Sequence, residues 1–150
     1  AHYVASVPVS ITRSAAFASL SRFDRAAEWD PGVEAGEMLT PEPVGVGSRF
    51  RLVARFLGRR IPLEYEIVEY DRDERIVLRA ENRSVRSVDT ITFEDDDHGS
   101  VVVYDAQLDA KGIGRLADPL LRRASSTCTW DQWSWISENQ EVARSQIYRP

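Results

Sequence analysis

The chain has 150 residues, of which 43% are hydrophobic and 29% charged, and a formal net charge of −5. No apolar run approaches the roughly 20 residues of a membrane-spanning helix, and the arginines alternate with acidic residues instead of forming the clustered basic face that nucleic-acid binding needs. We therefore expect one soluble domain over residues 1–150, with no integral membrane segment and no nucleic acid as partner.

Cys128 is the single cysteine, so the chain cannot form an internal disulfide. This fits a reducing compartment. The first residues, Ala-His-Tyr-Val, lack the basic and apolar layout of a secretory signal. These features predict a cytoplasmic protein.

The chain begins with a predicted strand and a short helix. Apolar and polar residues alternate over residues 4–11, and Pro8, which cannot donate to a ladder, indicates an edge position. Thr12-Arg13-Ser14 then offers an N-cap for a helix over residues 15–20.

A second short helix is predicted to follow. Asp24 is the expected capping residue, and the helix continues to Trp29. Asp30-Pro31-Gly32 ends it through turn chemistry. Residues 33–39 are predicted to form a strand, and residues 40–47, with two prolines and two glycines, a loop.

The strongest pattern in the chain is the alternation over residues 47–67. It places even-numbered apolar residues of the first half on one face and arginines on the other, which is typical of a half-buried antiparallel strand. With Gly58-Arg59 as a two-residue turn, Leu52 lies opposite Tyr65 and Arg51 lies opposite Glu66.

The same inward face continues through three more reversals. Turns at 71–74, 82–85 and 95–100 place Ile67 opposite Leu78, Leu78 opposite Asp89, and Ile91 opposite Tyr104. Since a slip of one residue in any turn would invert a strand, this shared parity predicts an antiparallel meander with one buried face.

A long C-terminal helix is predicted after Gly112-Ile113-Gly114. It begins at Asp118-Pro119 and contains no further Gly or Pro until about residue 146, a length of ~42 Å at 1.5 Å per residue. Leu121 lies on its apolar stripe, whereas Trp130 and Trp133 lie off it. The tryptophans at 130, 133 and 135 are either partly packed helix surface or an association patch, for example of a homodimer.

The predicted elements define an α+β fold of the helix-grip type. A sheet of five strands is roughly 24 Å wide, and a helix with its side chains only ~10–12 Å. We therefore expect a curved antiparallel sheet of six to seven strands wrapped around the C-terminal helix, with an apolar hollow between them. The predicted ligand-binding residues are Trp29, Leu52, Ala54, Phe56, Leu63, Tyr65, Ile67, Leu78, Asp89, Ile91, Tyr104, Leu108 and Leu121.

Tyr65, Asp89 and Tyr104 are the candidate catalytic residues within this lining. A buried ionised carboxylate is costly unless it is hydrogen-bonded, so Asp89 needs a partner. It is either a structural hydrogen-bonding group or a ligand contact and acid/base group. The tyrosines either form wall or orient a ligand, and Trp29 either anchors the core or lies at the pocket mouth.

Other kinds of site find little support. The chain has no nucleophile motif, no phosphate-binding glycine loop and no zinc-ligand spacing, so we expect no metal and no cofactor. The acidic turn at 95–98 is read as a solvated hairpin tip, because consecutive residues there do not converge on a cation.

Several segments resemble the SRPBCC (START/Bet v 1-like) superfamily: Trp-Asp-Pro-Gly-Val at 29–33, Gly-Val-Gly-Ser-Arg-Phe at 45–50, and Asp-Thr-Ile-Thr-Phe at 89–93. The chain is most similar to bacterial polyketide cyclase/dehydrase or lipid-transport members over residues 3–124, and residues 125–150 depart from their pattern. The resemblance implies a hydrophobic small molecule bound between sheet and helix, with Tyr65, Asp89 and Tyr104 placed to orient it.

Three functional hypotheses follow. The first is a carrier or sensor of a lipid or polyketide. The second is a polyketide aromatase/cyclase that uses the cavity acid and tyrosines. The third is a protein-interaction module formed by the tryptophan-bearing helix.

Overall fold

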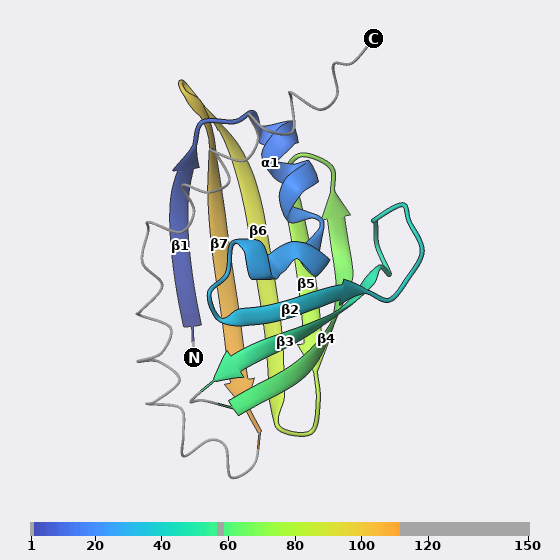
Figure 1. Ribbon diagram of the computed structural model, residues 1–150. Helices are drawn as coiled ribbons and strands as arrows, with labels where there is room; N and C mark the ends of the chain where they lie inside the picture. Colours follow the sequence, from blue (N-terminus) through green and yellow to red (C-terminus); the bar gives the residue numbers. More distant parts are fainter. Residues whose placement is uncertain (1, 57–58, 112–150) are drawn as a thin grey trace.

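Seven antiparallel strands form one sheet in the order β1-β7-β6-β5-β4-β3-β2, curled around two short helical elements (Figure 1). The computed structural model describes residues 2–56 and 59–111. The elements in chain order are β1 (His2–Val9), α1 (Arg13–Leu20), η1 (Phe23–Glu28), β2 (Val33–Met38), β3 (Arg49–Phe56), β4 (Arg59–Asp71), β5 (Arg75–Glu81), β6 (Val85–Asp96) and β7 (Gly99–Ala110).

The two edges of the sheet are β1 and β2, and the helical segment between them crosses its concave face (Figure 1). The edge position predicted from Pro8 is confirmed, although β1 spans His2–Val9 instead of residues 4–11. The predicted C-terminal helix, with Leu121 and the tryptophans at 130, 133 and 135, lies outside the described residues.

The inward parity of the meander is confirmed. Ile67 pairs with Leu78, Leu78 with Asp89, and Ile91 with Tyr104. One irregularity interrupts it, a bulge between Ile67 and Glu69 in β4.

The prediction for the β3–β4 hairpin is wrong by two residues. Leu52 lies opposite Leu63 and not Tyr65, and pairing continues to Arg59, which belongs to β4 and is not a turn residue. Arg51 accordingly lies opposite Glu64 instead of Glu66, and its Nη2 donates to Glu64 Oε1 at 2.9 Å. Because a shift of two residues returns every side chain to the same face, the inward set survives the error.

The predicted N-cap of helix α1 is confirmed at Thr12, although the helix begins at Arg13 instead of residue 15. The Thr12 hydroxyl oxygen accepts a hydrogen bond from the Ala15 backbone N–H at 3.2 Å, which satisfies one of the free donors at the helix start. Its inward side, formed by Ala16, Phe17 and Leu20, is buried.

The predicted cap of the second helix is wrong. Element η1 is a 3₁₀ helix whose N-cap position is Arg22, without a capping side chain. Asp24 accepts hydrogen bonds from the Arg22 guanidinium instead, at 3.0 and 2.9 Å. An adjacent arginine fork offers this carboxylate charge-assisted donors that compete with the backbone amides.

Element η1 lies directly against β2. A Cβ on Gly36 would stand 2.2 Å from the Asp24 carbonyl oxygen, so only glycine permits this approach. The segment then turns through Asp30, whose Oδ1 accepts from the Gly32 N–H at 2.7 Å, which confirms the predicted turn. The close packing fixes Trp29 and Asp30 above the concave face.

Candidate ligand site around Asp89

Asp89 lies in the middle of β6 on the concave face and is 3% exposed. Both carboxylate oxygens accept hydrogen bonds, Oδ1 from the Ser87 hydroxyl and Oδ2 from the Tyr104 hydroxyl, each at 2.7 Å. The partner that the sequence required for a buried acid is therefore present.

Burial raises the pKa of Asp89 to about 6, because the protein interior disfavours the charged form. The hydrogen bonds from Ser87 and Tyr104 oppose this shift, and the negative charge of Asp30 adds to it. At neutral pH Asp89 is therefore largely ionised, but its protonated form is within easy reach.

Tyr65 reaches the same group from β4. It lies opposite Ala80, which in turn lies opposite Ser87, so a small residue separates the phenol from the Ser87–Asp89 pair. Burial and the charge of Asp89 raise the pKa of Tyr65 and of Tyr104. Both tyrosines are therefore neutral phenols at physiological pH, and Tyr104 donates to Asp89. Tyr65, Ser87, Asp89 and Tyr104 are referred to below as the Asp89 cluster.

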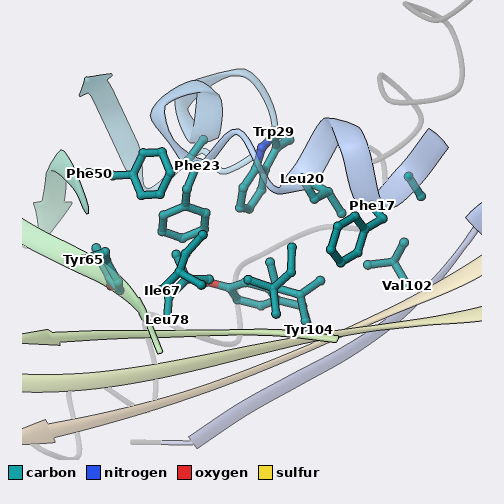
Figure 2. Close-up of a cluster of buried hydrophobic side chains, with 14 of the residues drawn as sticks. Phe17, Leu20, Phe23, Trp29, Phe50, Tyr65, Ile67, Leu78, Val102 and Tyr104 are labelled. Atoms are coloured by element: carbon teal, nitrogen blue, oxygen red, sulfur yellow. The ribbon is translucent and has the colours of Figure 1, made fainter. Parts of the chain in front are cut away.

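Two residues after η1 cover the cluster. The Trp29 ring stands 6.1 Å from the ring of Tyr104 at 70°, an edge contact, and 5.7 Å from Phe23. Figure 2 shows Phe23 and Trp29 pointing from the helical layer toward the sheet. Trp29 is 4% exposed. In the described structure it is a core residue.

Asp30 is the functional candidate that sequence reasoning missed, because the Asp-Pro-Gly motif indicates a turn and says nothing about burial. Burial raises the pKa of Asp30, and the hydrogen bond from the Gly32 N–H opposes the rise. Its charge acts on Asp89, Tyr65 and Tyr104 alike. The packing of η1 against β2, a tertiary effect, brings this second carboxyl to the site.

The predicted apolar lining divides into two parts. Ile67, Leu78 and Ile91 are at most 1% exposed and belong to the core under the helical layer. Leu52 and Leu63 are also buried. Toward the β3–β4 hairpin the inward residues are only partly buried, and we call this set the open end: Ala54, Ile61, Ala106 and Leu108. The side chain of Phe56 and all of Leu121 lie outside the described part of the chain.

The Asp89 cluster stands beside the open end. Asp89 pairs with Ala106 and Ser87 pairs with Leu108, both of which belong to it. Helix α1 lies toward the opposite end, where Arg13 contacts Asp95 near the β6–β7 turn at 3.6 Å (Figure 1). The polar groups therefore mark the boundary between the packed core and the partly exposed apolar surface.

Among residues 2–56 and 59–111, no helix is long and apolar enough to cross a membrane. Within the same residues, no three His, Cys, Asp or Glu side chains gather as metal ligands would.

A seven-stranded antiparallel sheet curled over short helical elements is a fold that this chain shares with solved structures, among them a START superfamily protein. A family model described as polyketide cyclase/dehydrase and lipid transport matches residues 1–134, and the chain belongs to this family. No curated protein matches the chain significantly.

Solved structures share this fold at low sequence identity. TTHA0849 from Thermus thermophilus is 18% identical with a TM-score of 0.77, over 95% of this chain and 99% of that one. A START superfamily protein from Mycobacterium smegmatis is 12% identical with a TM-score of 0.66, over 98% and 99%. The di-domain ARO/CYC StfQ of the steffimycin biosynthetic pathway is 16% identical with a TM-score of 0.70, over 96% of this chain and 51% of that one.

Proposed function

We propose that this protein binds an apolar small molecule, of the lipid or polyketide kind, at the open end of the concave face, with the Asp89 cluster as its polar anchor. The observation that carries the proposal is the position of the cluster, beside inward apolar residues that the described elements leave partly exposed. Apolar walls with a few converging polar groups are the usual composition of a small-molecule site.

The proposal includes a role for the C-terminal segment. Residues 118–146 would form the long helix that covers the open end, with Leu121 on its apolar stripe facing the ligand. The family match, which extends to residue 134, supports this arrangement. The whole chain would then act as a single ligand-binding domain.

The test is a set of ligand titrations on the full chain. Fatty alcohols, sterols and aromatic polyketides are titrated by calorimetry, and native mass spectrometry identifies any molecule that copurifies. Ala106→Trp fills the open end and should abolish binding. Ala18→Trp, on the exposed side of α1, is the matched control and should preserve it. The proposal fails if no compound binds, or if the two variants bind equally well.

A second candidate function is aromatase/cyclase activity. The observation in its favour is the convergence of Tyr104 and Asp89 at 2.7 Å, with the pKa of the acid raised to about 6. An acid tuned toward the working pH transfers protons efficiently, which contributes typically 10²–10⁴-fold to a rate.

The cyclase hypothesis predicts that the protein converts a poly-β-ketone thioester into a cyclised product. Asp89→Asn should lower that rate by roughly 10²-fold or more while the variant still binds the compound. Product formation no faster than the uncatalysed background would remove the hypothesis and leave the binding proposal intact.

A further inference from the structure

Within the Asp89 cluster, hydroxyl groups direct their hydrogens at the Asp89 carboxylate. Ser87 donates to Oδ1 and Tyr104 to Oδ2. The Tyr65 hydroxyl lies close enough to lower the pKa of Asp89, in the same direction as these two bonds. A hydroxyl group has one hydrogen to give and two lone pairs with which to accept. With the hydrogens of Ser87 and Tyr104 committed to Asp89, neither is left to donate to a ligand, and the ionised carboxylate itself offers only acceptor oxygen.

The charge around the cluster has the same consequence. Two acids, Asp30 and Asp89, act on the two tyrosines across a buried interior. Charges interact there far more strongly than in water, so the effect does not depend on direct contact.

In the described part of the chain, the hydrogen bonds to Asp89 come from hydroxyl groups, and the groups that shift its pKa are hydroxyls and the Asp30 carboxylate. By register Arg59 shares the inward face, but it is exposed at the β3–β4 tip, beyond Leu52 and Leu63. Arg13 lies at the other end, against Asp95. The outward arginines of β3 pair with glutamates on the convex face, as Arg51 does with Glu64.

We propose that the site selects apolar molecules carrying a hydrogen-bond donor that is not anionic, namely a hydroxyl, a phenol or an ammonium group, and excludes carboxylates such as free fatty acids. This inference rests on the proposed function and specifies its ligand class. A carboxylate brings only acceptors to a surface of acceptors, and places a third negative charge beside two. An alcohol or an ammonium group can donate a hydrogen bond to these acceptor oxygens.

Although burial raises the pKa of Asp89 to about 6, this value still lies below pH 7.5, so the group is largely ionised there and has no hydrogen of its own to donate.

The test uses two ligand series in which only the polar group changes. They are 2-naphthol, 2-naphthylmethylamine and 2-naphthoate, and dodecan-1-ol, dodecylamine and dodecanoate. Dissociation constants are measured by calorimetry on the full chain at pH 7.5. We expect the alcohol and the amine of at least one series to bind roughly tenfold or more tightly than the matching carboxylate, the size of effect that a nearby like charge has on an ionisable group.

Two variants test whether the charges of Asp89 and Asp30 cause the selectivity against carboxylates. Asp89→Asn removes the central charge and adds an amide donor. Asp30→Asn removes the second charge but keeps the oxygen that accepts from the Gly32 N–H, so the turn is preserved. Each variant should reduce, several-fold, the ratio of the carboxylate's dissociation constant to that of the matching alcohol. Asp109→Asn, the same change at an exposed position of β7, should leave it unchanged. Melting temperatures establish that each variant is folded.

The outcomes are distinct. A carboxylate that binds the wild type as tightly as its alcohol overturns the ligand class but leaves the proposed function standing. A preference for alcohols that persists unchanged in both folded Asp variants also overturns it. If no member of either series binds, the ligand class is overturned, and the titrations with sterols and aromatic polyketides decide the proposed function separately.

Discussion

The hydroxyl of Tyr104 donates to Oδ2 of Asp89 at 2.7 Å, although the two residues are not cross-strand partners. Tyr104 pairs with Ile91, and Asp89 pairs with Ala106. The bond is therefore diagonal, and it needs a side chain as long as tyrosine. Both residues are buried, so the contact joins β6 and β7 under the helical layer.

Removing this donor should destabilise the protein. Tyr104→Phe leaves one oxygen of a buried carboxylate without the tyrosine hydroxyl, and we expect the free energy of unfolding to fall by about 1–3 kcal/mol. The pKa of Asp89 should rise above its present value of about 6, because the bond from Tyr104 favours the ionised form. Urea unfolding and NMR titration of the carboxyl measure the two effects. Tyr70→Phe, which alters a tyrosine packed against Phe17, is the control. An unchanged Asp89 titration would contradict the prediction.

Asp89 should make stability depend on pH. Its pKa is about 6 in the folded protein and about 3.9 in an unfolded chain, so between these values the folded state binds more protons. The contribution of Asp89 to the free energy of unfolding therefore decreases as pH rises from about 4 to about 6, by roughly 3 kcal/mol in total.

Comparison with Asp89→Asn isolates this contribution. Urea unfolding at pH 4.5 and pH 7.5 should show the wild type losing stability relative to the variant at the higher pH. The raised pKa of Asp30 acts in the same direction but is present in both proteins, as are the exposed ion pairs. A difference between the two proteins that does not vary with pH would show that Asp89 titrates normally.

Gly36→Ala should separate η1 from β2. The new methyl group would stand 2.2 Å from the Asp24 carbonyl oxygen and 2.9 Å from a Leu52 methyl carbon, so the segment must move. We expect a loss of about 1–3 kcal/mol, the usual cost of overpacking. Gly45→Ala is the matched control, because a methyl group there meets nothing within 4 Å. Equal thermal midpoints for the two variants would refute this account of the contact.

Trp29→Phe should loosen the cover over the site. The indole is 4% exposed and packs against Phe23 and Tyr104, and a smaller ring leaves space that the core cannot fully close. We expect a loss of about 1–3 kcal/mol in urea unfolding, and a lower pKa for Asp89 as Asp30 becomes more exposed to solvent. A variant as stable as the wild type would indicate that Trp29 is not a core anchor.

The concave face could be predicted from the sequence because side-chain parity survives errors of two residues. The misplaced β3–β4 turn shows the limit. Leu52 opposite Tyr65 and Leu52 opposite Leu63 bury the same faces, so the apolar pattern cannot choose between them. The alternation of side chains was sufficient to predict that Asp89 lies on the inward face, and the cost of burying its charge predicted a hydrogen-bond partner.

Tertiary packing set the features that were not predicted. Asp24 was expected to cap a helix, but Arg22, two residues earlier, holds its carboxylate. Asp30 carries a clear turn motif, yet its burial depends on how η1 lies against Gly36. Neither outcome has a local signature, because each depends on a second element whose position the sequence does not state.

The bulge in β4 constrains how this scaffold can change length. Val68 is the extra residue between Ile67 and Glu69, and beyond it Tyr70 turns inward to meet Phe17 at 5.0 Å. Deleting Val68 alone would remove the bulge and restore regular alternation, with Glu69 still opposite Val77 and Tyr70 still inward opposite Ile76. The bulge is therefore the one place in the described part of β4 where a single residue can be lost without inverting the strand, and insertions or deletions elsewhere in this strand should occur in pairs.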